Sequence, residues 1–127
     1  MQQLIHRSIH FNKVILRLIF SHSFLMITFF GNLIIISFSL VFFALEFPEN
    51  QSVQSVLDAM WWGFATATTV GYGDIIPQTA AGKIVGILLM LMGTALFATY
   101  TALFAQTILG DELLRYQKKS KEPKEKD

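Results

Sequence analysis

The sequence predicts an all-α membrane protein, in which two transmembrane helices are separated by a short helix that enters the membrane and returns. Two long stretches without charge and a polar, glycine-rich segment between them indicate this class. The chain has 127 residues, of which 53% are hydrophobic. A soluble domain of this size could not keep enough of its surface polar with that composition. We therefore expect the chain to lie in the lipid bilayer of the cell membrane and to cross it more than once.

Both uncharged stretches are long enough to cross a membrane. Residues 24–45 are 22 residues without a charge, and residues 84–109 are 26. A transmembrane helix needs about 20 apolar residues. The first stretch is too long for the apolar region of a signal peptide, and no small-residue cleavage site follows it. We predict one helix at about 24–45 and another at about 84–112.

The basic residues predict the orientation. Nine of the ten Lys and Arg residues lie outside the segment between the two helices. The positive-inside rule then places both termini in the cytoplasm. The connecting segment faces outside with four carboxylates and one lysine, a net charge of −3: Glu46, Glu49, Asp58, Asp74 and Lys83.

The two ends of the chain are more polar than its centre. In residues 1–22, basic side chains recur at spacings of 3, 3 and 4, on one helical face: Arg7, His10, Lys13 and Arg17. We interpret residues 1–22 as an amphipathic helix at the cytoplasmic membrane surface; the alternatives are a linker from a sensor domain and a remnant of a voltage-sensor helix. Residues 113–127 form a charged cytoplasmic tail. We expect disorder after Leu114, because little apolar surface remains to be buried.

A short helix is predicted at about residues 56–67. Ser55 and Asp58 have the spacing of a capping box at its start. Its length of about 18 Å is too short to cross a bilayer, so it must enter the membrane and return. A re-entrant segment is tolerated only where it is buried in protein or lines water.

This helix is followed by the sequence TTVGYGD, residues 68–74. Backbone carbonyls at this depth need a partner. Gly71 and Gly73 can adopt left-handed conformations without penalty. If they alternate with right-handed neighbours, four successive carbonyls point the same way and could replace the water shell of an alkali cation: Thr69, Val70, Gly71 and Tyr72.

Together with Trp61-Trp62 before it and Pro77 after it, this stretch resembles the signature of potassium channels. The order of segments is similar to that of small bacterial two-transmembrane (KcsA-like) channels. The resemblance implies a homotetrameric pore domain over residues 23–112, with an outer helix, a pore helix, a selectivity filter at 69–74 and an inner helix. K+ would be the permeant ion, with no organic cofactor. The implied K+ ligands are Thr69, Val70, Gly71 and Tyr72, with Gly73 completing the ion-binding stretch.

The resemblance also implies supporting roles. Trp61, Trp62 and Thr68 would brace the filter, although aromatic residues at the membrane interface are an alternative for the tryptophans. Asp74 would concentrate cations at the outer mouth. Many family members carry a glutamate at the position of Ala65, so Asp74 lacks that partner here. The implied cavity and gate residues, for which helix packing is the alternative, are Gly93, Thr94, Phe97, Thr101, Ala105 and Glu112.

From this resemblance we expect a potassium-selective pore that conducts K+ passively, without enzymatic activity and without a nucleic-acid partner. Glu112 matches a carboxylate that takes part in proton gating in some relatives, with His22 nearby, so mild proton gating is a further hypothesis. One alternative is the isolated pore module of a larger voltage- or ligand-gated potassium channel that has a separate regulatory or sensor domain. The other is a non-conducting membrane subunit that modulates other channels.

Overall fold

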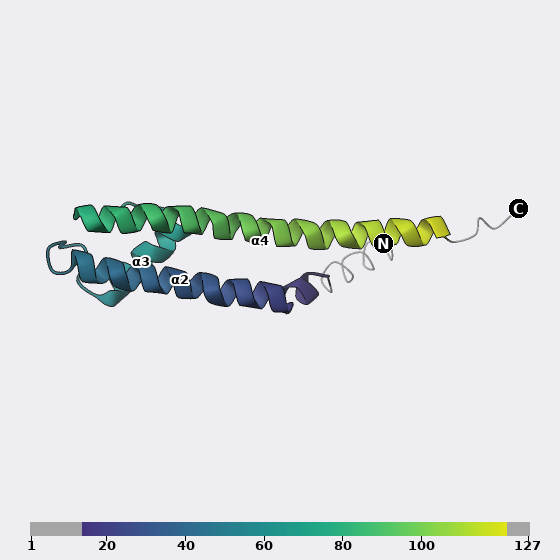
Figure 1. Ribbon diagram of the computed structural model, residues 1–127, viewed down its shortest axis with the longest axis horizontal. Coiled ribbons are helices and arrows are strands. Elements are labelled where there is room, and N and C mark those ends of the chain that lie inside the picture. The colour runs from purple at the N-terminus through teal and green to yellow at the C-terminus, as the bar shows by residue number, and fades with distance from the viewer. Residues whose placement is uncertain (1–13, 122–127) are drawn as a thin grey trace, which may run out of the picture. The chain divides into compact units, whose positions relative to one another are not determined.

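The computed structural model describes residues 14–121, which form helices joined by loops (Figure 1). Residues 14–19 are helical. The longer helices are α2 (His22–Glu46), α3 (Val56–Ala67) and α4 (Ala80–Lys121). None of the described residues lies in a β-strand, and the predicted all-α class is confirmed. Most of the amphipathic helix predicted at 1–22 lies outside the described residues.

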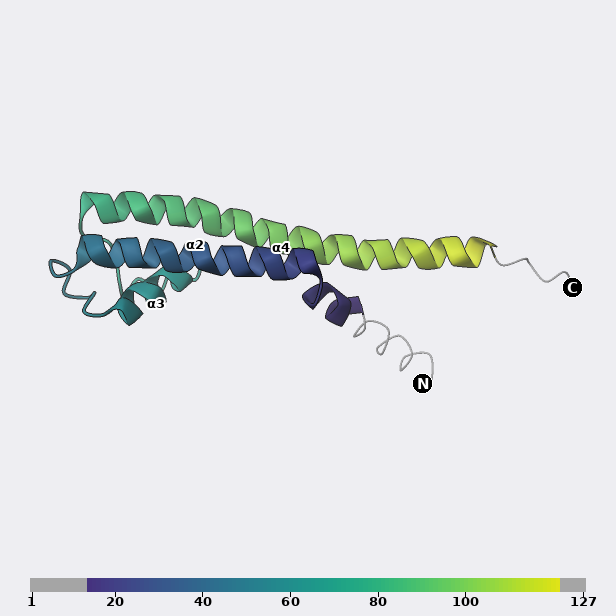
Figure 2. The same cartoon turned by 60° about the horizontal axis from the view of Figure 1, so that its bottom comes forward.

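The chain divides into two compact parts. One is Met26–Thr99, and the other combines Met1–Leu25 with Tyr100–Asp127. Within Met26–Thr99, α2 and α4 run side by side in opposite directions (Figures 1 and 2). Gly31 of α2 lies against Leu96, so the first residues of α2 in this part meet the last ones of α4.

α3 packs against both long helices within Met26–Thr99. Trp62 of α3 stacks on Phe42 of α2, with ring centroids 3.5 Å apart and an interplanar angle of 11°. The edge of the Trp62 ring formed by Cζ2 and Cη2 lies beside Gly86 of α4. The buried apolar core around this contact consists of Ile35, Phe42, Val53, Ala59, Trp62, Ala67 and Leu89.

α3 begins with the predicted capping box. The Ser55 hydroxyl accepts a hydrogen bond from the Asp58 N–H at 3.2 Å, and the Asp58 carboxylate accepts one from the Ser55 N–H at 2.8 Å. The Ser55 hydroxyl also donates to Asp58 at 2.8 Å. This bond, helped by the N–H groups of Ser55 and Gln54 and opposed by desolvation, lowers the pKa of Asp58 below its ordinary value of 3.8.

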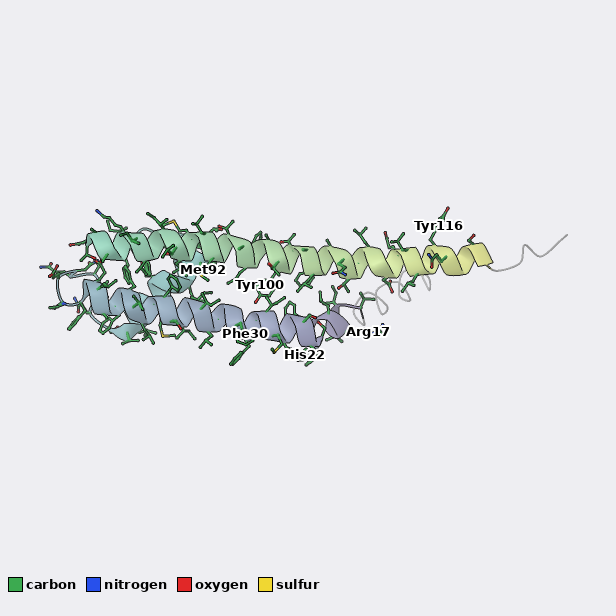
Figure 3. All side chains as sticks on the ribbon, in the orientation of Figure 1. Arg17, His22, Phe30, Met92, Tyr100 and Tyr116 are labelled. Carbon is green, nitrogen blue, oxygen red and sulfur yellow. The ribbon has the colours of Figure 1, made fainter. Side chains whose placement is uncertain are left out.

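α2 and α4 are the two described helices that are long and apolar enough to cross a membrane. They keep many large apolar side chains on the outside of the single chain, among them Phe29, Phe30 and Leu91. Phe30 is labelled in Figure 3. Such exposure is expected where helices face lipid or neighbouring copies of the chain.

α4 is longer at both ends than the helix predicted at about 84–112. It begins at Ala80, because the Thr79 hydroxyl accepts a hydrogen bond from the Gly82 N–H at 2.9 Å and caps the first turn. It continues to Lys121, so the expectation of disorder after Leu114 is wrong for residues 115–121. The physical reason is intrinsic propensity: this segment is rich in Lys, Arg and Gln and contains neither Gly nor Pro.

Candidate functional site

The loop that follows α3 has an alternating backbone. Thr69, Gly71 and Gly73 have positive φ angles of 62°, 54° and 76°. Val70 and Tyr72, between them, are not among the positive-φ residues. The left-handed conformations predicted for the two glycines are confirmed. The positive φ of Thr69 was not predicted, because β-branched residues seldom adopt this conformation and nothing in the sequence signals it.

Two successive N–H groups of this loop point back at one atom of α3. The N–H groups of Val70 and Gly71 both donate to the Ala65 carbonyl oxygen, each at 3.0 Å. A carbonyl oxygen has two lone pairs and can accept both. In a planar trans peptide, the N–H and the C=O point in opposite directions. The Thr69 carbonyl belongs to the same peptide group as the Val70 N–H, and the Val70 carbonyl to the same group as the Gly71 N–H. Both carbonyls therefore point away from Ala65, on the same side of the chain.

Side chains on the outer side of α3 hold the end of this loop. The rings of Trp61 and Tyr72 stack with centroids 5.2 Å apart and an angle of 7°. The Trp61 Nε1–H donates to the Asp74 carboxylate at 2.8 Å, and the Ile75 N–H donates to its other oxygen at 3.1 Å. The Trp61 indole is thus a side-chain donor to Asp74.

The structure separates the residues predicted to brace this loop. Trp61 contacts Tyr72 and Asp74, whereas Trp62 faces the opposite way and is buried on Phe42. Thr68 is the C-cap of α3, and its hydroxyl donates to the Phe64 carbonyl at 2.6 Å. Trp62 therefore belongs to the buried core against which Ile75 of the loop also packs, and Thr68 caps the end of α3, so their bracing roles stay predictions.

A buried carboxylate that the sequence did not single out joins α2 to the start of α4. Glu46 has no exposed surface. It accepts hydrogen bonds from the Gln78 N–H (2.9 Å), the Thr79 N–H (3.0 Å) and the Thr79 hydroxyl (2.8 Å). The Asn50 amide also donates to it at 2.7 Å and to the Ile76 carbonyl at 2.8 Å. The Glu46 carboxylate thus accepts hydrogen bonds from donors of Asn50, Gln78 and Thr79, and its charge strengthens these bonds.

Glu46 is one of the four carboxylates counted in the outer segment, whose net charge with one lysine is −3. Because it is buried, its charge acts on its hydrogen-bond partners and not at the outer surface. The signal that could have identified Glu46 is its place at the end of an apolar run, one helical turn before Asn50.

The residues predicted for a cavity and gate lie along α4 and differ in burial. Gly93 is buried against α3, whereas the other five are exposed on the single chain: Thr94, Phe97, Thr101, Ala105 and Glu112. The Thr94 hydroxyl donates to the Met90 carbonyl at 2.8 Å. Exposure of this set on one chain is compatible with a water-filled cavity and with contact between copies.

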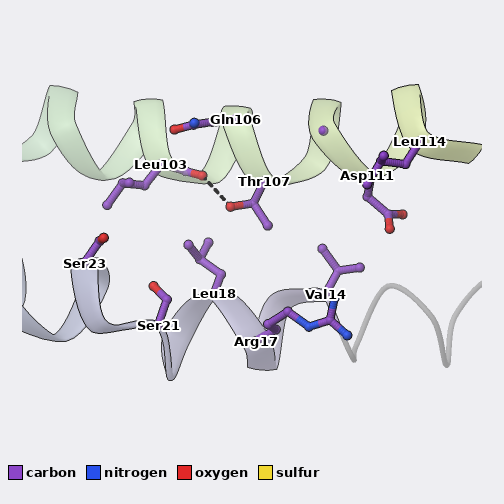
Figure 4. Close-up of a pocket in the computed structure, with 11 residues that line it drawn as sticks. Val14, Arg17, Leu18, Ser21, Ser23, Leu103, Gln106, Thr107, Asp111 and Leu114 are labelled. Atoms are coloured by element: carbon purple, nitrogen blue, oxygen red, sulfur yellow. Dashed lines mark hydrogen bonds between the residues drawn. The ribbon is translucent and has the colours of Figure 1, made fainter.

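A pocket of about 440 Å³ lies in the part of the chain that combines residues 14–25 with 100–121 (Figure 4). Its lining is mixed: Arg17 and Asp111 are charged, whereas Leu18 and Leu103 are apolar. The Thr107 hydroxyl on its wall donates to Leu103 at 2.8 Å. His22 and Glu112, the residues of the proton-gating hypothesis, are exposed and do not line this pocket.

The carbonyls of Thr69 and Val70 thus point to one side of a loop that lies between two apolar helices. Residues 16–109 match a protein family described as "Ion channel". The chain belongs to this ion-channel family. Because the family consists of channels, the expectation that the chain is not an enzyme is confirmed.

Three relatives of this channel chain are named as potassium channels. It is 45% identical over 74 residues to "Voltage-gated potassium channel" of Aeropyrum pernix, covering 54% of this chain and 25% of the relative. It is 47% identical over 58 residues to "Putative potassium channel protein YugO" of Bacillus subtilis, covering 42% of this chain and 18% of the relative. It is 34% identical over 88 residues to human "Potassium voltage-gated channel subfamily KQT member 4", covering 68% of this chain and 13% of the relative. The chain thus spans a quarter or less of these relatives.

A solved structure has a similar fold. A crystal structure of a voltage-gated K+ channel pore module in a closed state in lipid membranes matches with a TM-score of 0.53 and 32% identity. The match covers 73% of this chain and 91% of that one. The channel chain therefore corresponds in extent to nearly the whole of that pore module.

Proposed function

We propose that this chain is one of four identical subunits of a potassium-selective pore that conducts K+ passively across the cell membrane. The observation that carries the proposal is the pair of hydrogen bonds from the Val70 and Gly71 N–H groups to Ala65. These bonds occupy one side of the loop backbone, so the carbonyl oxygens are left for a ligand on the other side. Carbonyl oxygens in such rows replace the hydration shell of K+ in selectivity filters.

The proposed ion ligands are the carbonyls of Thr69, Val70, Gly71 and Tyr72. The alternation of φ along residues 69–73 supports the extension of the row beyond the first two oxygens. Gly73 completes the alternation and Asp74 follows it at the outer mouth, where its negative charge would raise the local concentration of cations.

A single chain presents these oxygens to one side of an ion only, so a complete ligand shell requires several copies. Four copies around one axis give rings of four oxygens, and two successive rings surround an ion with eight. The similarity to a K+ channel pore module supports this arrangement. The large apolar side chains exposed on α2 and α4 would then face lipid or the neighbouring subunit.

α3 has an electrostatic role in this proposal. The negative end of its helix dipole is its C-terminal end, at Ala67. Four such ends directed at the axis would stabilise a cation inside the membrane, where an unpaired charge is costly. On the cytoplasmic side, the α4 residues that would line the cavity and gate are Gly93, Thr94, Phe97, Thr101, Ala105 and Glu112.

The relatives favour a second, more specific proposal: that the chain corresponds to the pore module of a larger voltage-gated channel. The observation behind it is that the matching region makes up 25%, 18% and 13% of three relatives. The basic residues outside the segment between the helices support a cytoplasmic location for both termini, as a connection to cytoplasmic or sensor domains would require.

The experiment that tests the proposed function is ion flux through the purified chain in liposomes. Vesicles loaded with K+ should take up 86Rb+, and external Ba2+ should block the uptake. Replacement of the alternating glycine, Gly71→Ala, should abolish uptake, because φ of 54° at this position is strained for any residue with a side chain. Uptake that persists in Gly71→Ala, or wild-type vesicles that remain impermeable to 86Rb+, would contradict the proposal.

A further inference from the structure

One glycine of α4 lies directly against the backbone of α3. Gly93 is buried, and a Cβ atom built on it would overlap the carbonyl oxygen of Ala67. The same Cβ atom would lie 2.7 Å from the Ala67 Cα atom and 2.9 Å from its carbonyl carbon. Atoms this close repel strongly. The two helices therefore hold their present separation only with glycine at position 93.

Gly93 differs from the other glycines at helix contacts. At Gly63 and Gly82 an added Cβ atom would meet a side-chain oxygen, that of Ser39 and that of Glu46, and at Gly31 the end of the Leu96 side chain. At Gly86 the nearest atom would be Cζ2 of Trp62 at 3.4 Å, an ordinary van der Waals contact. At Gly93 the obstacle is backbone, so an added methyl group can be accommodated only if one helix moves relative to the other.

The backbone that Gly93 touches is the turn that holds the proposed filter. Ala67 is the last residue of α3, and the positive φ of Thr69 follows two residues later. The same turn carries the Ala65 carbonyl, which accepts the hydrogen bonds of Val70 and Gly71. A displacement of this turn therefore shifts the oxygens of residues 69 and 70.

The backbone conformation of Gly93 does not by itself require glycine. α4 is continuous from Ala80 to Lys121, and Gly93 is not among the residues with positive φ. The close contact with Ala67 accounts for a glycine at this position in an unbroken helix. The resemblance to potassium channels also implies that the inner helix hinges at Gly93, which would be a separate property.

We propose that Gly93 is a positioning residue for ion selectivity: by lacking a side chain, it lets α4 seat the last turn of α3 so that the carbonyls of Thr69 and Val70 have the correct spacing for K+. This inference rests on the proposed function. It assigns to Gly93 an effect on which ion passes, whereas a hinge alone affects how often the pore opens.

The test compares Gly93→Ala with the matched control Gly86→Ala, which adds the same methyl group to the same helix beside α3. Reversal potentials of each purified channel in planar bilayers, with K+ on one side and Na+ on the other, give the permeability ratio. We expect Gly93→Ala to reduce the K+/Na+ ratio by about tenfold or more, because ligand shifts of about 1 Å are large in a preorganised site. Gly86→Ala should retain the wild-type ratio.

A hinge account gives a different result. It predicts that Gly93→Ala opens less often with an unchanged ratio, and that Gly93→Pro, which bends a helix, opens more often with an unchanged ratio. An unchanged ratio in Gly93→Ala overturns the inference. If the Gly93→Ala homotetramer does not assemble, tetramers with one variant and three wild-type subunits provide the same measurement. A wild-type channel without K+ preference would instead contradict the proposed function itself.

Discussion

At the scale of single residues, Glu46 shows how a charge can serve the architecture of an ion pathway without touching the ion. It is buried, and four hydrogen bonds connect it to Asn50, Gln78 and Thr79. A buried charge is tolerated only when it is paired or fully hydrogen-bonded. These bonds fix the chain that leaves the loop after residue 74 and begins α4.

Glu46→Gln should lower the thermal unfolding temperature of the purified protein. The glutamine has nearly the same shape but replaces an acceptor oxygen with an NH2 group, which then faces an N–H or hydroxyl donor. Leaving a buried hydrogen-bonding group unsatisfied costs about 1–3 kcal/mol. Glu49→Gln is the control, because Glu49 is exposed. Equal unfolding temperatures for the two variants would show that the Glu46 hydrogen bonds do not stabilise the fold.

Trp61 and Asp74 give a second prediction at this scale. Trp61→Phe keeps an aromatic ring beside Tyr72 but removes the Nε1–H that donates to Asp74. We expect lower steady-state 86Rb+ uptake, because the outer end of the loop loses its tie to α3. In a double-mutant cycle with Asp74→Asn, the two effects on uptake should be non-additive, as for residues in direct contact. Additive effects would exclude a functional role for this hydrogen bond.

At the scale of elements, the start of α3 depends on one carboxylate. The Ser55 hydroxyl and two N–H groups stabilise the charged form of Asp58 and lower its pKa below 3.8. A group with a lowered folded-state pKa stabilises the protein above its unfolded pKa and loses this contribution as the pH falls through the folded pKa. The capping box should therefore stabilise the protein at neutral pH and lose this contribution in acid.

Asp58→Asn should lower the thermal unfolding temperature at pH 7, since the capping box loses its charged acceptor. The difference in unfolding temperature between wild type and variant should narrow as the pH falls from about 3.8, the ordinary pKa of Asp58, through its lower folded-state pKa. Thermal unfolding followed by circular dichroism from pH 7 to pH 3 measures this gap. A gap that stays constant over this range would show that the charge of Asp58 does not stabilise α3.

The elements were predictable from the sequence where local signals decide them. The capping residues Ser55 and Asp58 marked the start of α3, and the glycines at 71 and 73 marked two of the three positive φ angles found in the loop that follows α3. The end of α4 was not predicted, because the expectation weighed apolar burial after Leu114 and neglected the helix propensity of the residues that follow.

At the scale of the whole molecule, the contacts between distant segments could not be read from the sequence. Glu46 meets Thr79, 33 residues away, and Gly93 meets Ala67 across two helices. No local pattern specifies which distant groups a carboxylate meets or which glycine touches backbone. The apolar lengths and the TTVGYGD segment were sufficient for the all-α membrane class and the channel family, both of which the comparisons confirm.

Assembly is the prediction that belongs to this scale. The purified protein in mild detergent should have a protein mass of four chains by native mass spectrometry, because one chain supplies ion ligands to one side only. K+ should stabilise the tetramer against thermal dissociation relative to Na+, since bound ligand stabilises the state that binds it. A monomer or dimer that carries K+ flux would contradict the fourfold arrangement.

The central claim is that the backbone carbonyls of residues 69–72 from four chains surround a dehydrated cation. The most direct measurement is anomalous X-ray scattering from crystals grown in Rb+, which replaces K+ at such sites. The account predicts a row of anomalous peaks on a fourfold axis, each surrounded by oxygens of Thr69, Val70, Gly71 or Tyr72. Peaks away from these residues, or carbonyls that face away from the shared axis, would contradict it.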